Sequence, residues 1–171
     1  MNLRKVLCLL VLLVAPIGLA FGQKKAKEKA DAETEMFRYE VEQTTVSATT
    51  GDLNIRVYSF SKNPNVAEEQ TKKNAIHACI YKGIPACADK PGSQKRPLIT
   101  NADQEKAEEY FTHFFKDGGE YMRFVVLTSA TPKITKIGKE YKVGVVVKVN
   151  YSELRKHLES NGILKGLASG F

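Results

Sequence analysis

The sequence lacks the short motifs that usually carry enzymatic chemistry. It contains no GxSxG nucleophile elbow, no GxxxxGK[ST] phosphate loop and no GxGxxG segment after a strand. It also lacks the HxH and HExxH spacings that zinc sites commonly use. These absences argue against the common hydrolase, nucleotide-binding and zinc-enzyme classes. We therefore expect a protein that is not an enzyme, with no catalytic residues, no cofactor and no metal site.

Histidine and cysteine are scarce, which limits the nucleophiles and bases that the chain offers. His77 is expected on the buried half of a helix, whereas His113 and His157 are expected at surface positions of helices. Beyond the N-terminal segment only Cys79 and Cys87 remain, eight residues apart. In an oxidising compartment this spacing favours a disulfide. Two separate structural thiols are the main alternative, and a reactive cysteine is the third.

Long apolar runs are confined to the N-terminus. Arg4 and Lys5 precede an apolar stretch from Val6 to Phe21, and Ala20-Phe21-Gly22 places small residues before Gln23. This order is typical of a cleaved secretory signal peptide, here residues 1–22. The stretch of 16 residues is shorter than the roughly 20 that span a bilayer, which argues against an uncleaved anchor. We expect a periplasmic or secreted protein without a transmembrane segment after cleavage.

The mature chain has a moderate excess of positive charge. Cleavage removes two of the 26 basic residues and none of the 19 acidic ones. The remaining lysines are scattered among glutamates, as on an ordinary soluble surface. Outside the cytoplasm nucleic acid is not an expected partner, whereas anionic lipid headgroups and acidic glycans are compatible with this charge.

The first half of the mature chain predicts a hairpin followed by a helix. Residues 23–35 are charged and lack large apolar residues, so we expect a flexible leader. Apolar and polar residues then alternate over 37–47 and 53–61, which predicts two paired strands. A helix is expected from about residue 63 to residue 82, because Gly83 ends the pattern. Residues 84–100 contain three prolines and predict a long loop.

The second half predicts another helix and two more strands. The helix is expected over 102–117, followed by a buried strand over 121–127. Pro132 and the lysines around it predict a hairpin arm, and the alternation over 141–151 predicts a long strand. Ser152 is expected to cap a short last helix.

Together these elements predict a single α+β domain over residues 36–171. The order is β-β-α-α-β-β-α, and we expect a two-layer sandwich of about four mainly antiparallel strands. Two main helices cover one face in this prediction, because strands with one apolar face need helices with apolar stripes as cover.

Two segments are candidates for binding a partner. One is the basic, proline-rich and glycine-rich part of the long loop, and the other is the apolar C-terminal tail. The candidate residues are Lys90, Lys95 and Arg96 in the loop and Leu164, Leu167 and Phe171 in the tail.

Several sequence blocks resemble known groups of exported proteins. Residues 57–61 and 67–75 look like the strand-to-helix unit of small envelope modules, namely the LPP20-like and FlgT-type N-terminal domains. Nearly the whole of residues 37–171 resembles uncharacterised secreted envelope proteins of the Bacteroidetes group. The blocks that carry this resemblance are AEEQTKKNAIHACIYKGIP, FFKDGGEYM, GKEYKVGVVVKVN and GILKGLASGF. The resemblance implies a location and a fold, and implies no activity.

The sequence thus predicts an exported, non-catalytic accessory or assembly protein that binds an envelope protein or surface. A small envelope enzyme with a site at the 84–100 loop is one alternative. A lipid or glycan carrier is the other, and it needs an enclosed apolar cavity. The sequence does not determine the partner or the oligomeric state.

Overall fold

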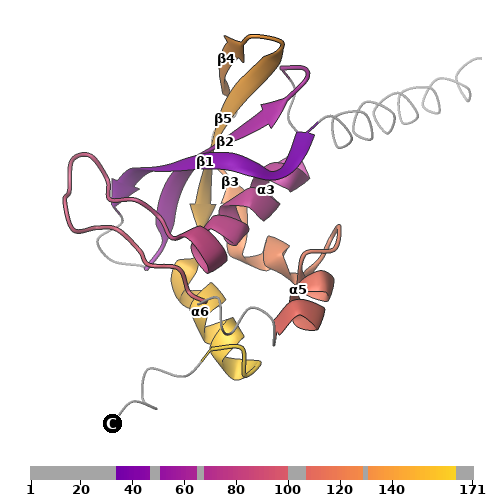
Figure 1. Cartoon of the computed structure of the whole chain (residues 1–171). Helices are drawn as coiled ribbons and strands as arrows, with labels where there is room; N and C mark the ends of the chain where they lie inside the picture. Colours follow the sequence, from indigo (N-terminus) through magenta and orange to yellow (C-terminus); the bar gives the residue numbers. More distant parts are fainter. Residues whose placement is uncertain (1–33, 47–50, 65–67, 100–106, 129–130, 165–171) are drawn as a thin grey trace, which may run out of the picture.

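The chain folds as an open antiparallel sheet with helices packed against it (Figure 1). The computed structural model describes residues 34–46, 51–64, 68–99, 107–128 and 131–164. The expected α+β class is confirmed, and the sheet has five strands. The expected signal peptide and nearly all of the expected leader lie outside the described residues.

The first two strands form the expected hairpin. Strand β1 (Thr34–Val46) pairs antiparallel with β2 (Leu53–Ser61). Every second residue of β2 is buried, and Ile55 and Val57 are completely inaccessible to solvent. The period-two pattern therefore places one face of the hairpin in the core and leaves the other face for polar side chains.

Strand β5 (Glu140–Val149) organises the rest of the sheet. It pairs with β2 along one edge. Its other edge is divided, because β3 (Val125–Leu127) pairs with its last residues and β4 (Lys133–Ile137) pairs with its first. The hairpin arm predicted from the sequence is therefore β4 and the beginning of β5.

The strand predicted over 121–127 is wrong in its first half. Residues Glu120–Phe124 form a 3₁₀ segment, η3, and extended structure begins only at Val125. Tyr121 and Phe124 are both buried and lie three residues apart, which matches the three-residue turn of a 3₁₀ helix. The apolar run fits both structures, because periodicity alone does not distinguish a short buried strand from a buried helical turn.

Helix α3 (Glu68–His77) packs on the inner face of the sheet (Figure 1). The contact includes polar groups as well as apolar ones. The Asn74 side chain donates to the Ser59 hydroxyl at 3.0 Å and accepts from the side chain of Gln70 at 3.0 Å. Because these groups at the interface bond to one another, the contact avoids the cost of unsatisfied polar atoms.

The helix widens at its end into a π segment, η1 (Ala78–Lys82), so the predicted single helix has two parts. The Gly83 N–H closes the last wide turn by donating to the carbonyl five residues earlier. The carbonyls of Cys79 and Ile80 accept hydrogen bonds from the backbone N–H groups of Leu98 and Ile99. The π segment therefore anchors the end of the long loop.

Two further helices lie toward the end of the sheet where β5 leads into α6 (Figure 1). They are α5 (Glu108–Phe114) and α6 (Tyr151–Ser160). The N-cap of α6 is Asn150, whose side chain accepts from the Glu153 N–H, so the prediction of Ser152 as the cap is wrong. Asn150 is the cap because its side-chain oxygen reaches the free N–H groups of the first turn of the helix.

Candidate functional site

The most exposed structured element is an edge hairpin, which we define as residues 133–142. It contains β4, a two-residue turn and the first residues of β5, and all five residues of β4 are exposed. Gly138 has a φ of 61° and occupies the first turn position, where a type II′ turn places glycine. Only β5 pairs with β4 in the described sheet, so the outer backbone edge of β4 is open.

The edge hairpin exposes two large aliphatic side chains. Ile134 is 47% exposed and Ile137 is 49% exposed. Their spacing of three residues places them on opposite faces of the hairpin, with Ile134 opposite Val143 and Ile137 opposite Glu140. Exposed apolar side chains that lie close together often mark an interaction site.

Two charged side chains of the β5 part of the edge hairpin form ion pairs with β1. Arg38 of β1 binds the Glu140 carboxylate at 3.0 Å and also lies over the ring of Phe60. Lys142 binds the carboxylate of Glu40. At this part of the sheet the cations of β1 and β5 are thus matched by acids.

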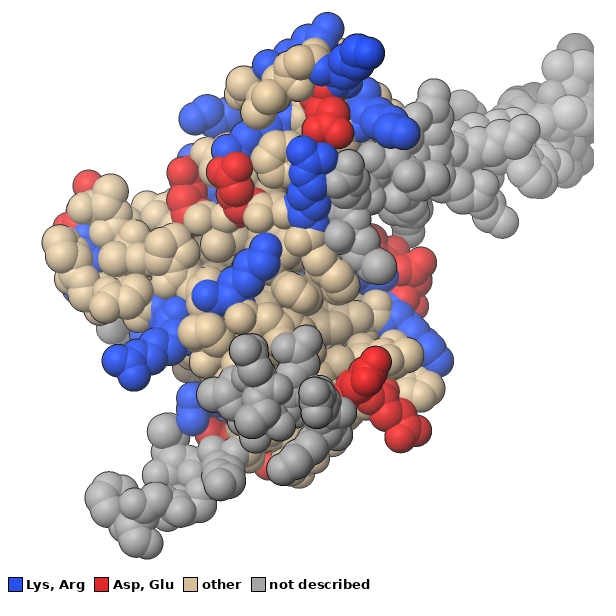
Figure 2. Space-filling model, viewed as in Figure 1, with Lys and Arg blue, Asp and Glu red and all other residues tan. Residues whose placement is uncertain are grey.

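The lysines of β4 and its turn differ from these neighbours. Among the described residues, no carboxylate lies within ion-pair distance of Lys133, Lys136 or Lys139. Lys136 lies 5.9 Å from the ring of Tyr141. Figure 2 shows basic side chains gathered at the end of the molecule formed by the edge hairpin. This end therefore carries an excess of positive charge.

The basic loop predicted to bind a partner is exposed but tied to the domain. Lys90, Lys95 and Arg96 are all exposed. The backbone groups of Ile84 and Lys95 exchange two hydrogen bonds of 2.8 Å, and the Ser93 hydroxyl donates to a side-chain amide of β1 at 3.2 Å. These contacts give the loop a defined shape.

The two cysteines are free thiols in the structure, unlike the disulfide expected from their spacing. Cys79 is fully buried in the π segment, whereas Cys87 lies in the loop with its sulfur 3.7 Å from the carbonyl of Thr44. The anchored loop directs the two side chains to different neighbours. Burial raises the pKa of the Cys79 thiol to about 12, so this residue is protonated at neutral pH.

His77 lies at the boundary of the core, as expected, inside a group of aromatic rings. Its Nδ1 is 2.6 Å from the hydroxyl of Tyr39, and the ring of Phe37 stacks on it at 4.1 Å. Burial lowers the pKa of His77 to about 4, with the nearby Lys82 charge as a smaller cause. At neutral pH the ring is therefore uncharged.

His157 connects three elements and is less exposed than the sequence predicted. Its Nε2 lies 2.9 Å from the Tyr110 hydroxyl of α5 and 3.0 Å from the Glu120 carboxylate of η3. The side chain is only 16% exposed. Leu154, three residues earlier and so on the same side of the helix, was the sequence signal for this location. His113, in contrast, is exposed as expected.

A pocket of about 450 Å³ lies beside this contact. It is lined by Glu109, Tyr110, His113, Phe114 and Glu120. Burial raises the pKa of Tyr110 to about 12, so its hydroxyl keeps its proton at neutral pH. The Nε2 atom of His157 thus contacts both a tyrosine and a carboxylate, and these contacts connect α6 to α5 and η3.

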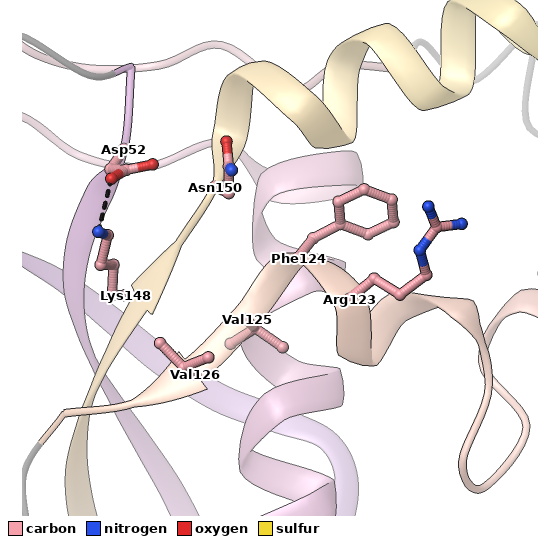
Figure 3. Close-up of a pocket in the computed structure, with 7 residues that line it drawn as sticks. All are labelled: Asp52, Arg123, Phe124, Val125, Val126, Lys148 and Asn150. Atoms are coloured by element: carbon pink, nitrogen blue, oxygen red, sulfur yellow. Dashed lines mark ion pairs between the residues drawn. The ribbon is translucent and has the colours of Figure 1, made fainter.

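A second, smaller pocket of about 220 Å³ lies where β5 meets α6 (Figure 3). Asp52 and Lys148 form an ion pair of 2.8 Å on one side of it, and the Asn150 side chain caps α6. Val126 at its border is 55% exposed. The polar groups that line this pocket already bind other parts of the protein.

The beginning of the predicted binding tail packs on the domain. Leu164 is partly buried against the core, and its N–H donates to the carbonyl of Leu158. Leu167 and Phe171, the other two tail candidates, lie outside the described residues. Within the described part of the chain, no group of three His, Cys, Asp or Glu side chains is placed to hold a metal ion. No helix of that part has the length and apolar character to cross a membrane.

Comparison with known proteins adds no relative to this picture. The chain matches no protein-family model, no curated protein and no solved structure. The resemblance to secreted envelope proteins stays a prediction, and function has to be argued from the geometry of the molecule itself.

Proposed function

We propose that the protein is an exported, non-catalytic accessory module whose edge hairpin binds an anionic surface of the cell envelope. The observation that carries this proposal is the combination of unpaired charge and exposed apolar surface on one projecting element. Lys133, Lys136 and Lys139 have no carboxylate partner among the described residues, and Ile134 and Ile137 stand beside them. An uncompensated positive patch attracts anionic partners over distances of about a Debye length.

The protonation states of the buried groups favour binding over catalysis. A general base works best when its pKa is near the operating pH. The pKa of His77 is about 4, so this ring is a weak base whose Nδ1 already contacts Tyr39. The pKa of Cys79 is about 12, so the thiolate that a nucleophile requires is scarce at neutral pH.

The edge hairpin is a better binding element than the basic loop. Lys95 of the loop lies 5.9 Å from the ring of Tyr151, whose hydroxyl is 3.5 Å from the carbonyl of Arg96. The loop therefore directs part of its surface toward α6. The described part of the loop also presents no large exposed apolar side chain, whereas the hairpin presents two.

Two triple variants with equal loss of charge test this proposal. One is K133Q/K136Q/K139Q in the hairpin, and the other is K90Q/K95Q/R96Q in the loop. All six residues are exposed, so we expect the free energy of unfolding of each variant to differ from that of the wild type by no more than about 0.5 kcal/mol.

Cell fractionation provides the readout for the two variants. We expect the wild type to be found in the envelope fraction as a processed chain that starts at Gln23, as mass spectrometry of the purified protein would show. The hairpin variant should move to the soluble exported fraction, while the loop variant should stay with the envelope. Retention of the hairpin variant in the envelope fraction would contradict the proposal, as would an unprocessed chain in the cytosol.

A further inference from the structure

We infer that the surface bound by the edge hairpin is an anionic phospholipid bilayer, which the hairpin enters with its turn first. This inference rests on the proposed function and names its partner. It follows from where the aliphatic and basic side chains lie on the hairpin and from the size of the element.

Each face of β4 carries one isoleucine and one lysine. Ile134 and Lys136 share one face, because they are two residues apart in a strand. Lys133 and Ile137 share the other face. A protein partner that packs on one face of a strand pair leaves the second face in water. A fluid bilayer interface surrounds the tip, so it accepts apolar side chains from both faces at once.

The lysines lie along the whole length of β4 and its turn, so their side chains reach the headgroups from different depths. Lys133 lies at the far end of β4 from the turn, and Lys139 is in the turn itself. A lysine side chain has a long aliphatic stem, which lets its ammonium group reach headgroup phosphates while neighbouring apolar atoms go deeper. Each basic residue close to an anionic leaflet strengthens membrane binding by about five-fold.

The size of the element also favours a bilayer over a protein. Specific protein interfaces bury on the order of 1,000 Å² or more, with a well-packed apolar centre. One exposed strand with two separated isoleucines offers much less than this. Weak, reversible membrane association needs only a few inserted apolar groups together with several basic ones.

Vesicle sedimentation tests the lipid inference directly. The mature protein would be mixed with vesicles of phosphatidylcholine containing phosphatidylglycerol, and with vesicles of phosphatidylcholine alone. We expect binding to the anionic vesicles only, and weaker binding at high salt because salt screens the attraction. The K133Q/K136Q/K139Q variant should bind about 100-fold more weakly, since three five-fold effects multiply. The K90Q/K95Q/R96Q variant should bind almost as the wild type does.

Insertion of the tip can be followed by the fluorescence of one introduced tryptophan, because the chain contains none of its own. In an Ile137→Trp variant, the single indole should shift its emission to the blue when anionic vesicles are added. A Val126→Trp variant is the matched control, because Val126 is 55% exposed, close to the 49% of Ile137, but lies on β3, which pairs with the opposite end of β5. Its emission should not change.

The outcomes separate the lipid inference from the proposed function. Absence of wild-type binding to anionic vesicles would overturn the lipid inference. The proposed function would survive that result if the hairpin variant still left the envelope fraction, and the partner would then be an acidic protein or glycan. An indole at position 137 that stays in water on bound vesicles would also overturn the insertion.

Self-association of the hairpin variant provides a further criterion. Lysines on an edge strand prevent pairing between sheets of different molecules. If the variant dimerised through β4 while its monomer bound vesicles as tightly as the wild type, the lysines would protect the edge and the lipid inference would be overturned.

Discussion

The edge hairpin and the π segment contain the same kinds of residue in opposite environments. Ile80 of the π segment is completely buried, whereas Ile134 of the hairpin is 47% exposed. Beside the π segment, His77 is held neutral by burial and bonded to Tyr39, while the lysines of the hairpin have no described acid partner. The groups of one region are thus satisfied by internal contacts, whereas the other region leaves aliphatic and basic side chains exposed to solvent.

The largest expected effect comes from matched substitutions of isoleucine. Ile80→Ala should lower the free energy of unfolding by about 2–5 kcal/mol, because it removes a fully buried side chain and leaves a cavity. Ile134→Ala should change the same quantity by no more than about 0.5 kcal/mol. Urea denaturation of both variants measures the difference. Equal losses would mean that the hairpin is an integral part of the core.

The second effect is a dependence of stability on pH that originates at the π segment. The unfolded chain binds a proton on His77 below about pH 6.5, whereas the folded protein keeps the ring neutral until about pH 4. The contribution of His77 to the free energy of unfolding is therefore fully present above about pH 6.5 and is lost as the pH falls to about 4. We expect a loss on the order of 1–2 kcal/mol, allowing for the partly exposed ring.

A His77→Gln variant isolates this contribution from the titration of carboxyl groups. The variant and the wild type would be unfolded in urea at pH 7 and at pH 4. The wild type should lose more stability between the two pH values than the variant does. The same loss in both proteins would show that the neutral ring of His77 does not contribute to the pH dependence.

The smallest effect is chemical rather than energetic and concerns the two thiols. The mature, purified protein should show almost no reaction with a thiol reagent when folded, because Cys79 and Cys87 are 0% and 5% exposed. After unfolding in denaturant without reductant, both cysteines should react. If neither reacted, the two residues would form the disulfide that their spacing favours, and the loop would be fixed covalently to the π segment.

The sequence was informative wherever residues alternate or form a long apolar arc. Alternation over 53–61 and 141–151 predicted β2 and β5 closely, because each strand has one buried face. The lysines after Pro132 indicated the hairpin arm. These features depend on local periodicity, which a single sequence records directly.

Features that depend on tertiary contacts were missed. The 3₁₀ turn before β3 forms where Tyr121 donates to Glu69 of α3, and nothing near residue 121 indicates that partner. The contact of His157 with Tyr110 joins two helices that are distant in the sequence. The sequence also does not indicate the binding role that we propose for Ile134 and Ile137, because only the sheet order shows that β4 is an edge strand.

The divided edge of β5 has a mechanical consequence. A pull on the tip of the edge hairpin would run along β5, which pairs with β2 over the length of that strand and leads directly into α6. The hydrogen bonds of the β2–β5 ladder lie across this direction, so they would bear the load together and not one after another. A molecule tethered by the tip would therefore resist tension along the whole β2–β5 ladder.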